Sequence, residues 1–259
     1  MRDQLEEAGK HRDDGYGRAQ HHVKTQLPKR FYSQTGVSPV DGGFSVTLDG
    51  RATRTPALKL PVVVPHADIA MHMADEWAAQ GELIDPAKMP MVRLINSALE
   101  SGEALVPAFR DEVVKFAGND LLLYRADYPS ELVAEQETHW DAALVKVARH
   151  FGVSFQPTVG VMHQDQPPPT LARLAEVLQH ENLLVMTALV SITGISGSGI
   201  LAIGLWHKLF TPDELWTAAH VDEDFQNRQW GIDEEAAERR RMRRLEFDTA
   251  VKVLDALRN

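Results

Sequence analysis

The chain contains no cysteine among its 259 residues. Without a thiol it can form no disulfide framework, no thiolate nucleophile and no zinc–thiolate centre. It also lacks an apolar run of the length that a membrane-spanning helix requires. The longest apolar segment, residues 183–205, is interrupted by Gly194, Gly197 and Gly199. We therefore expect no insertion into a membrane.

Basic residues are fewer than acidic ones: 27 lysines and arginines stand against 37 aspartates and glutamates, a formal net charge of −10. This balance argues against a general nucleic-acid-binding protein and against binding to an anionic membrane surface. The basic cluster Arg239–Arg244 has carboxylates on both sides of it, which favours a solvated, ion-paired helix face over a phosphate site. The polar, acidic N-terminus resembles neither a secretory signal nor a transit peptide, which favours a bacterial cytoplasmic protein.

Catalytic and cofactor motifs are also scarce. The chain has no Walker loop, no His-Glu-x-x-His, no kinase signature and no Gly-x-Ser-x-Gly elbow. The nearest match is the Gly-x-Gly-x-x-Ala pattern at Gly197–Ala202, with Asp222 20 residues beyond its last position. A dinucleotide-binding unit needs alternating strands and helices around such a turn, whereas the flanking patterns here are helical and favour close helix packing. We expect no cofactor, and a nucleotide-binding enzyme that uses this turn remains the alternative. The histidines do not recur at metal-ligand spacing, so no metal site is predicted.

The first 65 residues divide into a polar segment and a β-rich segment. Residues 1–28 are rich in Gly, His, Asp, Glu and Arg without periodicity, which predicts a flexible arm. From residue 29 to 65 the pattern is typical of strands, because Phe44, Val46 and Leu48 alternate with polar residues between Asp-Gly turns. Leu58–Val64 is expected to form an edge strand because it contains Pro61. We predict a small antiparallel sheet of three to five strands.

Helical periodicity begins after Pro65 and continues to the C-terminus. Apolar stripes and glycine stops predict helices over about 69–77, 89–100, 106–117, 130–151, 212–230 and 234–257. Residues 153–161 are expected to be extended, and 164–169 to form a polar, proline-rich linker. The predicted fold class is therefore α+β, with a small antiparallel β-rich N-terminal domain at 29–65 and a larger, predominantly α-helical domain at 66–259.

Local signals are clearest near the C-terminus. Thr211 and Glu214 predict a capping box that starts a helix, and we expect this helix to continue to Gly231. Asp233 is expected to cap the last helix. The chain has five tryptophans, Trp77, Trp140, Trp206, Trp216 and Trp230. Core packing is the favoured interpretation of all five. An exposed tryptophan beside Gln80 or Gln226 would instead be a protein-contact anchor.

Three consecutive carboxylates, Asp222, Glu223 and Asp224, suggest acid–base chemistry at first sight. Consecutive helical residues point about 100° apart, so these groups do not form a facing catalytic pair. Asp224 and Arg228 have the i,i+4 spacing of a helical ion pair. A solvated helix face is therefore the favoured interpretation.

A set of short motifs follows a fixed order along the chain. They are Lys29-Arg30-Phe31-Tyr32, Leu48-Asp49-Gly50-Arg51 with Arg54-Thr55-Pro56, Glu76-Trp77 with Gln80, Met89-Pro90 with Arg93 and Asn96, Asp120 with Tyr124-Arg125, and Asp222–Gln226 before Trp230-Gly231. Together they resemble the ATP-synthase F1 assembly chaperone family that is dedicated to the alpha subunit. The resemblance covers about residues 29–257, and it implies the same two-part α+β architecture.

This resemblance implies a chaperone and not an enzyme. Its partner would be the free F1-ATPase alpha subunit, whose interface it shields until beta replaces it in the hexamer. The family's functionally important acidic residue maps to Glu223 or Asp224, and Asp222, Gln226 and Trp77 are further candidates for partner contact. We expect a monomer when free, in the bacterial cytoplasm, for which the mitochondrial matrix would be the eukaryotic counterpart. A scaffold for a different ring assembly is a second alternative.

Overall fold

The computed structural model describes residues 27–258. The predicted flexible arm lies outside the described residues except for its last two positions. The described chain divides into two compact units. The smaller comprises residues 27–31 together with Gln80–Asp85, and within it Ile84 N donates to Pro28 O at 2.8 Å. The larger comprises Tyr32–Ala79 and the chain from Pro86 onward, and most of the elements described below belong to it.

A three-stranded antiparallel sheet opens the larger unit. Its strands β1 (Thr35–Val40), β2 (Gly43–Leu48) and β3 (Arg51–Ala52) lie in the order β1-β2-β3. Val46 and Leu48 are buried, as the alternating pattern predicts, and helix α2 (Ala67–Ala78) packs against β1 and β2. Asp49 and Gly50 both have positive φ, the backbone that a two-residue hairpin turn requires.

The strand predicted at Leu58–Val64 does not form, which corrects the expectation from sequence. This segment touches the sheet only through isolated bridges, Arg54 with Pro61 and Phe44 with Val64. Pro61 has no N–H to donate to a ladder, and Lys59 adopts a positive φ that turns the chain. The turn before it is fixed from outside the sheet, because the Glu100 carboxylate accepts hydrogen bonds from Ala57 N and Leu58 N at 2.7 and 3.0 Å.

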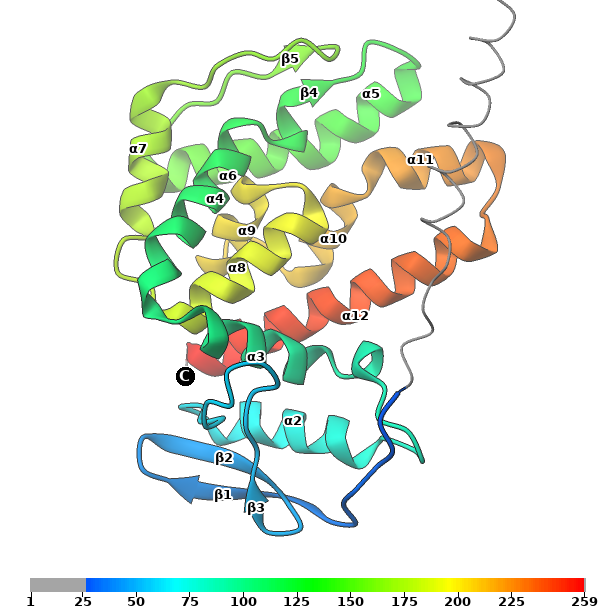
Figure 1. The fold of residues 1–259 in the computed structure, drawn as a ribbon. Helices are drawn as coiled ribbons and strands as arrows, with labels where there is room; N and C mark the ends of the chain where they lie inside the picture. Colours follow the sequence, from blue (N-terminus) through cyan, green and yellow to red (C-terminus); the bar gives the residue numbers. More distant parts are fainter. Residues whose placement is uncertain (1–26, 259) are drawn as a thin grey trace, which may run out of the picture. The chain divides into compact units, whose positions relative to one another are not determined.

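Helices form most of the remaining chain (Figure 1). After α2 they are α3 (Pro90–Ser101), α4 (Val106–Gly118), α5 (Ser130–Gln136), α6 (Ala142–Phe151), α7 (Pro168–Val177), α8 (Leu183–Ser196), α9 (Gly199–Trp206), α10 (Pro212–Ala219), α11 (Val221–Trp230) and α12 (Glu234–Leu257). A π-helical segment, η5 (Glu137–Asp141), joins α5 to α6, so the predicted helix at 130–151 is continuous. Serine is a common N-cap, which favours Ser130 as the cap of this helix, but Ser130 is its first residue and provides no side-chain cap.

The core of the larger unit is built around α8 and α9. Both helices are apolar on nearly every side, and they pack against one another and against α4 and α10. In addition, α3 and α12 pack against α8, and α6 packs against α9. Figure 1 shows α8 and α9 (yellow) enclosed by these neighbours. The backbones of α9 and α4 approach closely at Gly199, where an added Cβ would lie 2.2 Å from Val113 O. Only glycine fits there.

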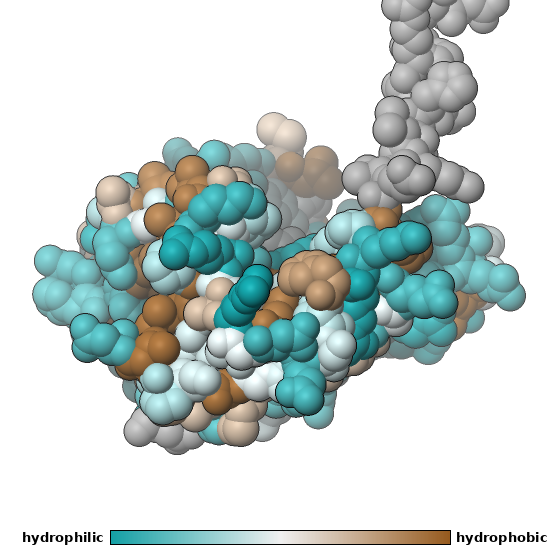
Figure 2. Space-filling model, turned by 60° about the horizontal axis from the view of Figure 1, so that its bottom comes forward, coloured by the Kyte–Doolittle hydropathy of each residue, from teal (hydrophilic) through white to brown (hydrophobic). Residues whose placement is uncertain are grey.

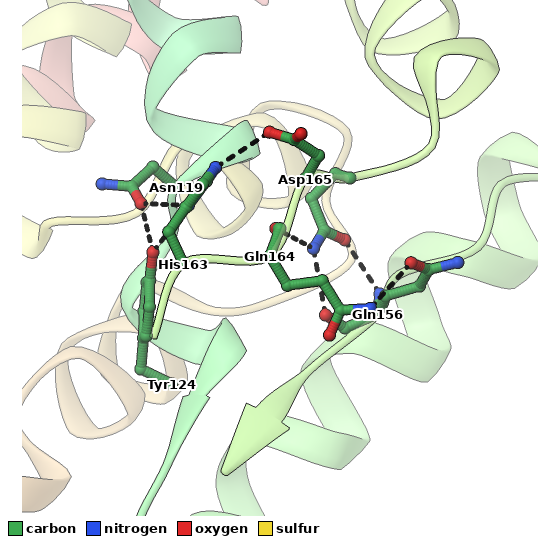
Figure 3. A network of polar contacts seen from close by, with 7 residues as sticks. Asn119, Tyr124, Gln156, His163, Gln164 and Asp165 are labelled. Atoms are coloured by element: carbon green, nitrogen blue, oxygen red, sulfur yellow. Dashed lines mark hydrogen bonds and ion pairs between the residues drawn. The ribbon is translucent and has the colours of Figure 1, made fainter. Parts of the chain in front are cut away.

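The chain between α6 and α7, residues 153–166, forms a strap held by polar contacts. Its strand β5 (Thr158–Val159) pairs in parallel with β4 (Tyr124–Arg125). Figure 3 shows His163 between Asp165 and the Asn119–Tyr124 pair, with His163 Nδ1 3.0 Å from Tyr124 Oη. Gln166 is buried and bonds twice to the backbone of Gln156. The predicted linker at 164–169 is therefore an ordered part of the fold, and α7 begins inside it.

The predicted fold class is confirmed. A small antiparallel strand region precedes a predominantly helical region, although the domain boundary at residue 65 stays a prediction. Across residues 27–258, no helix is long and apolar enough to cross a bilayer.

Candidate functional site

The predicted helix from 212 to Gly231 is in fact two helices, α10 and α11. The capping box that starts α10 is present, with Glu214 N donating to Thr211 Oγ1 and Thr211 N donating to Glu214 Oε2. The break comes at His220, whose ring is buried and stacks on Trp216 at 4.0 Å. His220 Nδ1 forms a hydrogen bond with Trp216 O at 2.7 Å. This bond occupies the carbonyl oxygen that would accept a backbone N–H if the helix continued into its next turn. Burial also lowers the pKa of His220 below its ordinary value.

Breaking the helix gives α11 its own direction and exposes one of its faces. Asp222, Gln226 and Trp230 follow one another at i,i+4 spacing, and all three are exposed. Trp230 is 87% exposed and Ile232, just beyond the Gly231 stop, is 67% exposed. The core interpretation of Trp230 was therefore wrong. Its spacing from Gln226 was the signal that could have identified it.

Ion pairs to two neighbouring helices fix α11. Asp224 pairs with Arg240 of α12, and Arg228 pairs with Glu135 of α5. The predicted Asp224–Arg228 pair is thus replaced by contacts between helices. On the α5 side, Gln136 Nε2 also donates to Asp222 Oδ1 at 2.8 Å. These contacts hold the exposed face of α11 in one orientation.

Glu223 and Asp224 have different surroundings, although they are adjacent in sequence. The Asp224 carboxylate accepts a hydrogen bond from Arg240, and this bond raises the pKa of Arg240. Glu223 Oε1 lies 3.9 Å from Arg240 Nη1, and its Oε2 lies 4.0 Å from His220 Nε2. Asp224 is therefore engaged within the fold, whereas Glu223 makes only longer contacts.

A groove of about 350 Å³ lies between α11 and α12, next to Glu223. Its apolar lining includes Trp216, Ile232 and Ala237, and its polar lining includes Glu223, Arg240 and Arg241. Sequence reasoning missed this groove, because it exists only where α10, α11 and α12 meet.

Trp77 lies apart from this site, on α2 (Figure 1). Its ring packs edge-on against Tyr32 at 5.5 Å, and its carbonyl oxygen accepts from Tyr32 Oη at 2.6 Å. The neighbouring Glu76 caps α3 by accepting hydrogen bonds from Met91 N and Val92 N, both at 2.8 Å. The structure therefore brings Asp222, Glu223, Asp224 and Gln226 together on α11, but not Trp77.

The glycine-rich turn at Gly197–Ala202 is filled by the protein itself. Ser198 caps α9, and the fully buried Asp120 accepts a hydrogen bond from Ile200 N at 2.9 Å. A carboxylate thus occupies the helix N-terminus where a nucleotide phosphate would bind. Burial raises the pKa of Asp120 to about 7, against hydrogen bonds that lower it. Among the described residues, no group of three or more His, Asp or Glu side chains is placed to hold a metal ion.

Hydropathy does not single out a partner-binding surface on the face drawn in Figure 2. There, apolar side chains are dispersed among hydrophilic ones. The α11 surface stands out for its exposed tryptophan, Trp230, because tryptophan is enriched among the residues that dominate binding at protein interfaces.

Comparisons with known proteins agree with the motifs quoted above. A family model described as the ATP12 chaperone protein matches residues 29–148. A solved structure of a candidate chaperone from Agrobacterium tumefaciens is 41% identical, with a TM-score of 0.84 over 89% of this chain and 87% of that one. The structure of Atp12 from Paracoccus denitrificans is 32% identical, with a TM-score of 0.79 over 88% of this chain and 98% of that one.

A curated relative extends the similarity to eukaryotes. The mitochondrial protein atp12 of Schizosaccharomyces pombe is 20% identical over 226 residues, which span 81% of this chain and 76% of that protein. The resemblance drawn from the ordered motifs is confirmed: the chain belongs to the ATP12 chaperone family.

Proposed function

We propose that this chaperone binds the free alpha subunit of F1-ATPase through the exposed face of α11. It covers the surface of alpha that the beta subunit later occupies, and it leaves as the hexamer forms. An unassembled ring subunit exposes a large interface patch that invites aggregation, so a temporary cover has a physical purpose. The observation that carries the proposal is Trp230, 87% exposed on the same helix face as Asp222 and Gln226.

The α11 surface is organised before the partner arrives. Pairs from Arg228 to Glu135 and from Asp224 to Arg240 hold the helix at both flanks. A surface that is already ordered loses less conformational entropy on binding. Trp230 can then serve as the anchor, while neighbouring carboxylates meet a basic group on alpha.

Glu223 and Asp224 have distinct roles in this proposal. Glu223, with a side chain 39% exposed and only longer contacts to Arg240 and His220, is the carboxylate offered to alpha. Asp224 is a positioning residue, because its bond to Arg240 sets the orientation of α11. Reversal of either charge is expected to weaken the complex. Reversal at Glu223 removes a direct contact with alpha, whereas reversal at Asp224 disturbs the orientation of α11.

Co-purification with isolated alpha and beta subunits tests the proposal. We expect a stable complex of the monomeric chaperone with alpha and none with beta. Glu223→Lys should weaken alpha binding by about tenfold or more with an unchanged melting temperature, since charges at interfaces act on affinity. Asp224→Lys should lower both affinity and melting temperature, because the new lysine faces Arg240.

Glu112→Lys is the matched control, since Glu112 is exposed on α4, which carries none of the candidate site residues. This variant should bind alpha like the wild type. The proposal fails if folded wild-type protein does not bind alpha, or if the control loses as much affinity as Glu223→Lys. Saturable binding of ATP or NAD would favour the nucleotide-binding alternative instead.

A further inference from the structure

The groove between α11 and α12 combines an apolar floor with walls of opposite charge. Trp216 and Ala237 supply apolar surface, and Ile232 extends it to the exposed turn between the two helices. Glu223 contributes from α11, and Arg240 and Arg241 contribute from α12. Glu223 lines this groove and directly follows Asp222 of the exposed α11 face, so the groove borders the proposed alpha-binding surface.

The arginines of the groove differ in how firmly they are held. Arg240 is held by its bond to Asp224, and Arg244 bonds to both Asp213 and Asp248. Arg241 pairs with Glu238 on its own helix, and its side chain is 75% exposed. An exposed pair of this kind contributes little stability, so its guanidinium group can turn to an incoming carboxylate at little loss.

The occupant follows from these charges and from the size of the groove. About 350 Å³ is near the lower end of the volumes found for ligand pockets, which suits an inserted side chain better than a whole ligand. We infer that the groove receives one large apolar side chain of the alpha subunit, with an acidic neighbour that meets Arg241 and a basic neighbour that meets Glu223. This inference rests on the proposed function, and it specifies the chemistry of the segment that is bound.

Filling the groove without changing its charge tests the inference. Ala237→Trp should weaken binding of purified alpha by about tenfold or more while the melting temperature stays near the wild-type value. Ala142→Trp is the control, because it places the same side chain in a different groove of about 360 Å³ between α6 and α10. This control should retain wild-type affinity for alpha.

A charge reversal tests the arginine wall independently. Arg241→Glu should weaken alpha binding by about fivefold or more, because the acidic neighbour then meets a like charge. Arg239→Glu makes the same change two positions away on α12, at an exposed arginine that pairs with Glu235. The Arg239→Glu variant should bind within about twofold of the wild type, as rim charges outside the contact do.

The possible outcomes separate the inference from the proposed function. If wild-type protein binds alpha and Ala237→Trp binds it equally well, the groove inference is overturned and the proposed function stands. Equal losses in Arg241→Glu and Arg239→Glu would also overturn it, since only net charge would then matter. If the free chaperone dimerises and Ala237→Trp separates the dimer, the occupant is a second copy of this chain. If the wild type binds no alpha, both proposals fall together.

Discussion

Asp120 carries a carboxyl group into the interior of the helical region, where it joins two segments of the chain. One oxygen accepts from Leu122 N at 3.2 Å and the other from Ile200 N at 2.9 Å. These bonds suit the ionised form, but removal from water disfavours it more strongly and raises the pKa of Asp120 to about 7. The same residue that appears in the family motifs therefore connects the end of α4 to the start of α9.

The elevated pKa of Asp120 predicts how stability depends on pH. Because the folded state holds this proton more tightly than an unfolded chain with a pKa near 3.8, the group's contribution to stability decreases as pH rises from about 4 to about 7. The free energy of unfolding of the wild type should therefore fall more steeply over this range than that of Asp120→Asn, by about 1 kcal/mol or more. Urea unfolding at several pH values measures both slopes.

Asp111→Asn serves as a control for this measurement, since Asp111 is exposed on α4. Its pH slope should match the wild-type slope. If Asp120→Asn also retained the wild-type slope, titration of Asp120 would not be the source of the pH dependence.

At the scale of single elements, the start of α9 packs closely against the backbone of α4. An added Cβ at Gly199 would lie 2.2 Å from Val113 O and 2.7 Å from Ala117 N. Backbone atoms cannot withdraw as a flexible side chain can. The spacing between α4 and α9 therefore depends on this glycine.

Gly199→Ala should destabilise the protein by about 2 kcal/mol or more, as overpacking of a close-packed core does. Gly194→Ala is the matched control, because Gly194 lies within helix α8 with no atom within 4 Å of an added Cβ. This control should be stabilised by up to about 1 kcal/mol through the helix propensity of alanine. Urea unfolding of both variants gives the comparison, and equal effects would contradict the packing argument.

Elements whose ends are set by neighbouring residues were predictable from sequence. The capping box at Thr211 and the cap at Asp233 involve residues three positions apart, so their sequence pattern is enough. The break at His220 was not predictable, because it depends on a buried ring stacked on Trp216. The strand expected at 58–64 failed for a similar reason, since a carboxylate from α3 fixes the preceding turn.

The candidate site was predictable only in part. The family motif located the acidic segment of α11. The helical periodicity predicted that its consecutive carboxylates point in different directions. The partner of Asp224 was misassigned because Arg240 reaches it from another helix. The exposure of Trp230 and the groove beside Glu223 depend on the packing of three helices, which no local pattern encodes.

At the scale of the whole molecule, the chain has a net charge of −10, and its proposed interface meets a basic group on alpha. Electrostatic attraction between opposite charges accelerates association and is screened by salt. The rate constant for association with alpha should therefore fall as sodium chloride is raised from about 0.05 to about 0.5 M, with a smaller change in dissociation. Stopped-flow kinetics measure both constants.

The Glu223→Lys variant should show a weaker salt dependence of association than the wild type, because it lacks one attracting charge. Glu112→Lys alters the net charge equally and separates a local effect from a global one. A wild-type association rate that does not respond to salt would argue against a basic contact surface on alpha.

The high exposure of Trp230 also gives the chaperone an optical reporter of its own occupancy. Trp140 and Trp216 are buried, and Trp77 and Trp206 are partly covered, so a small soluble quencher in water reaches Trp230 most readily. When a partner covers the end of α11, its indole leaves water, so its emission should shift to the blue and resist iodide. Trp230→Phe should abolish most of this change, and the wild type would then register alpha binding without any attached dye.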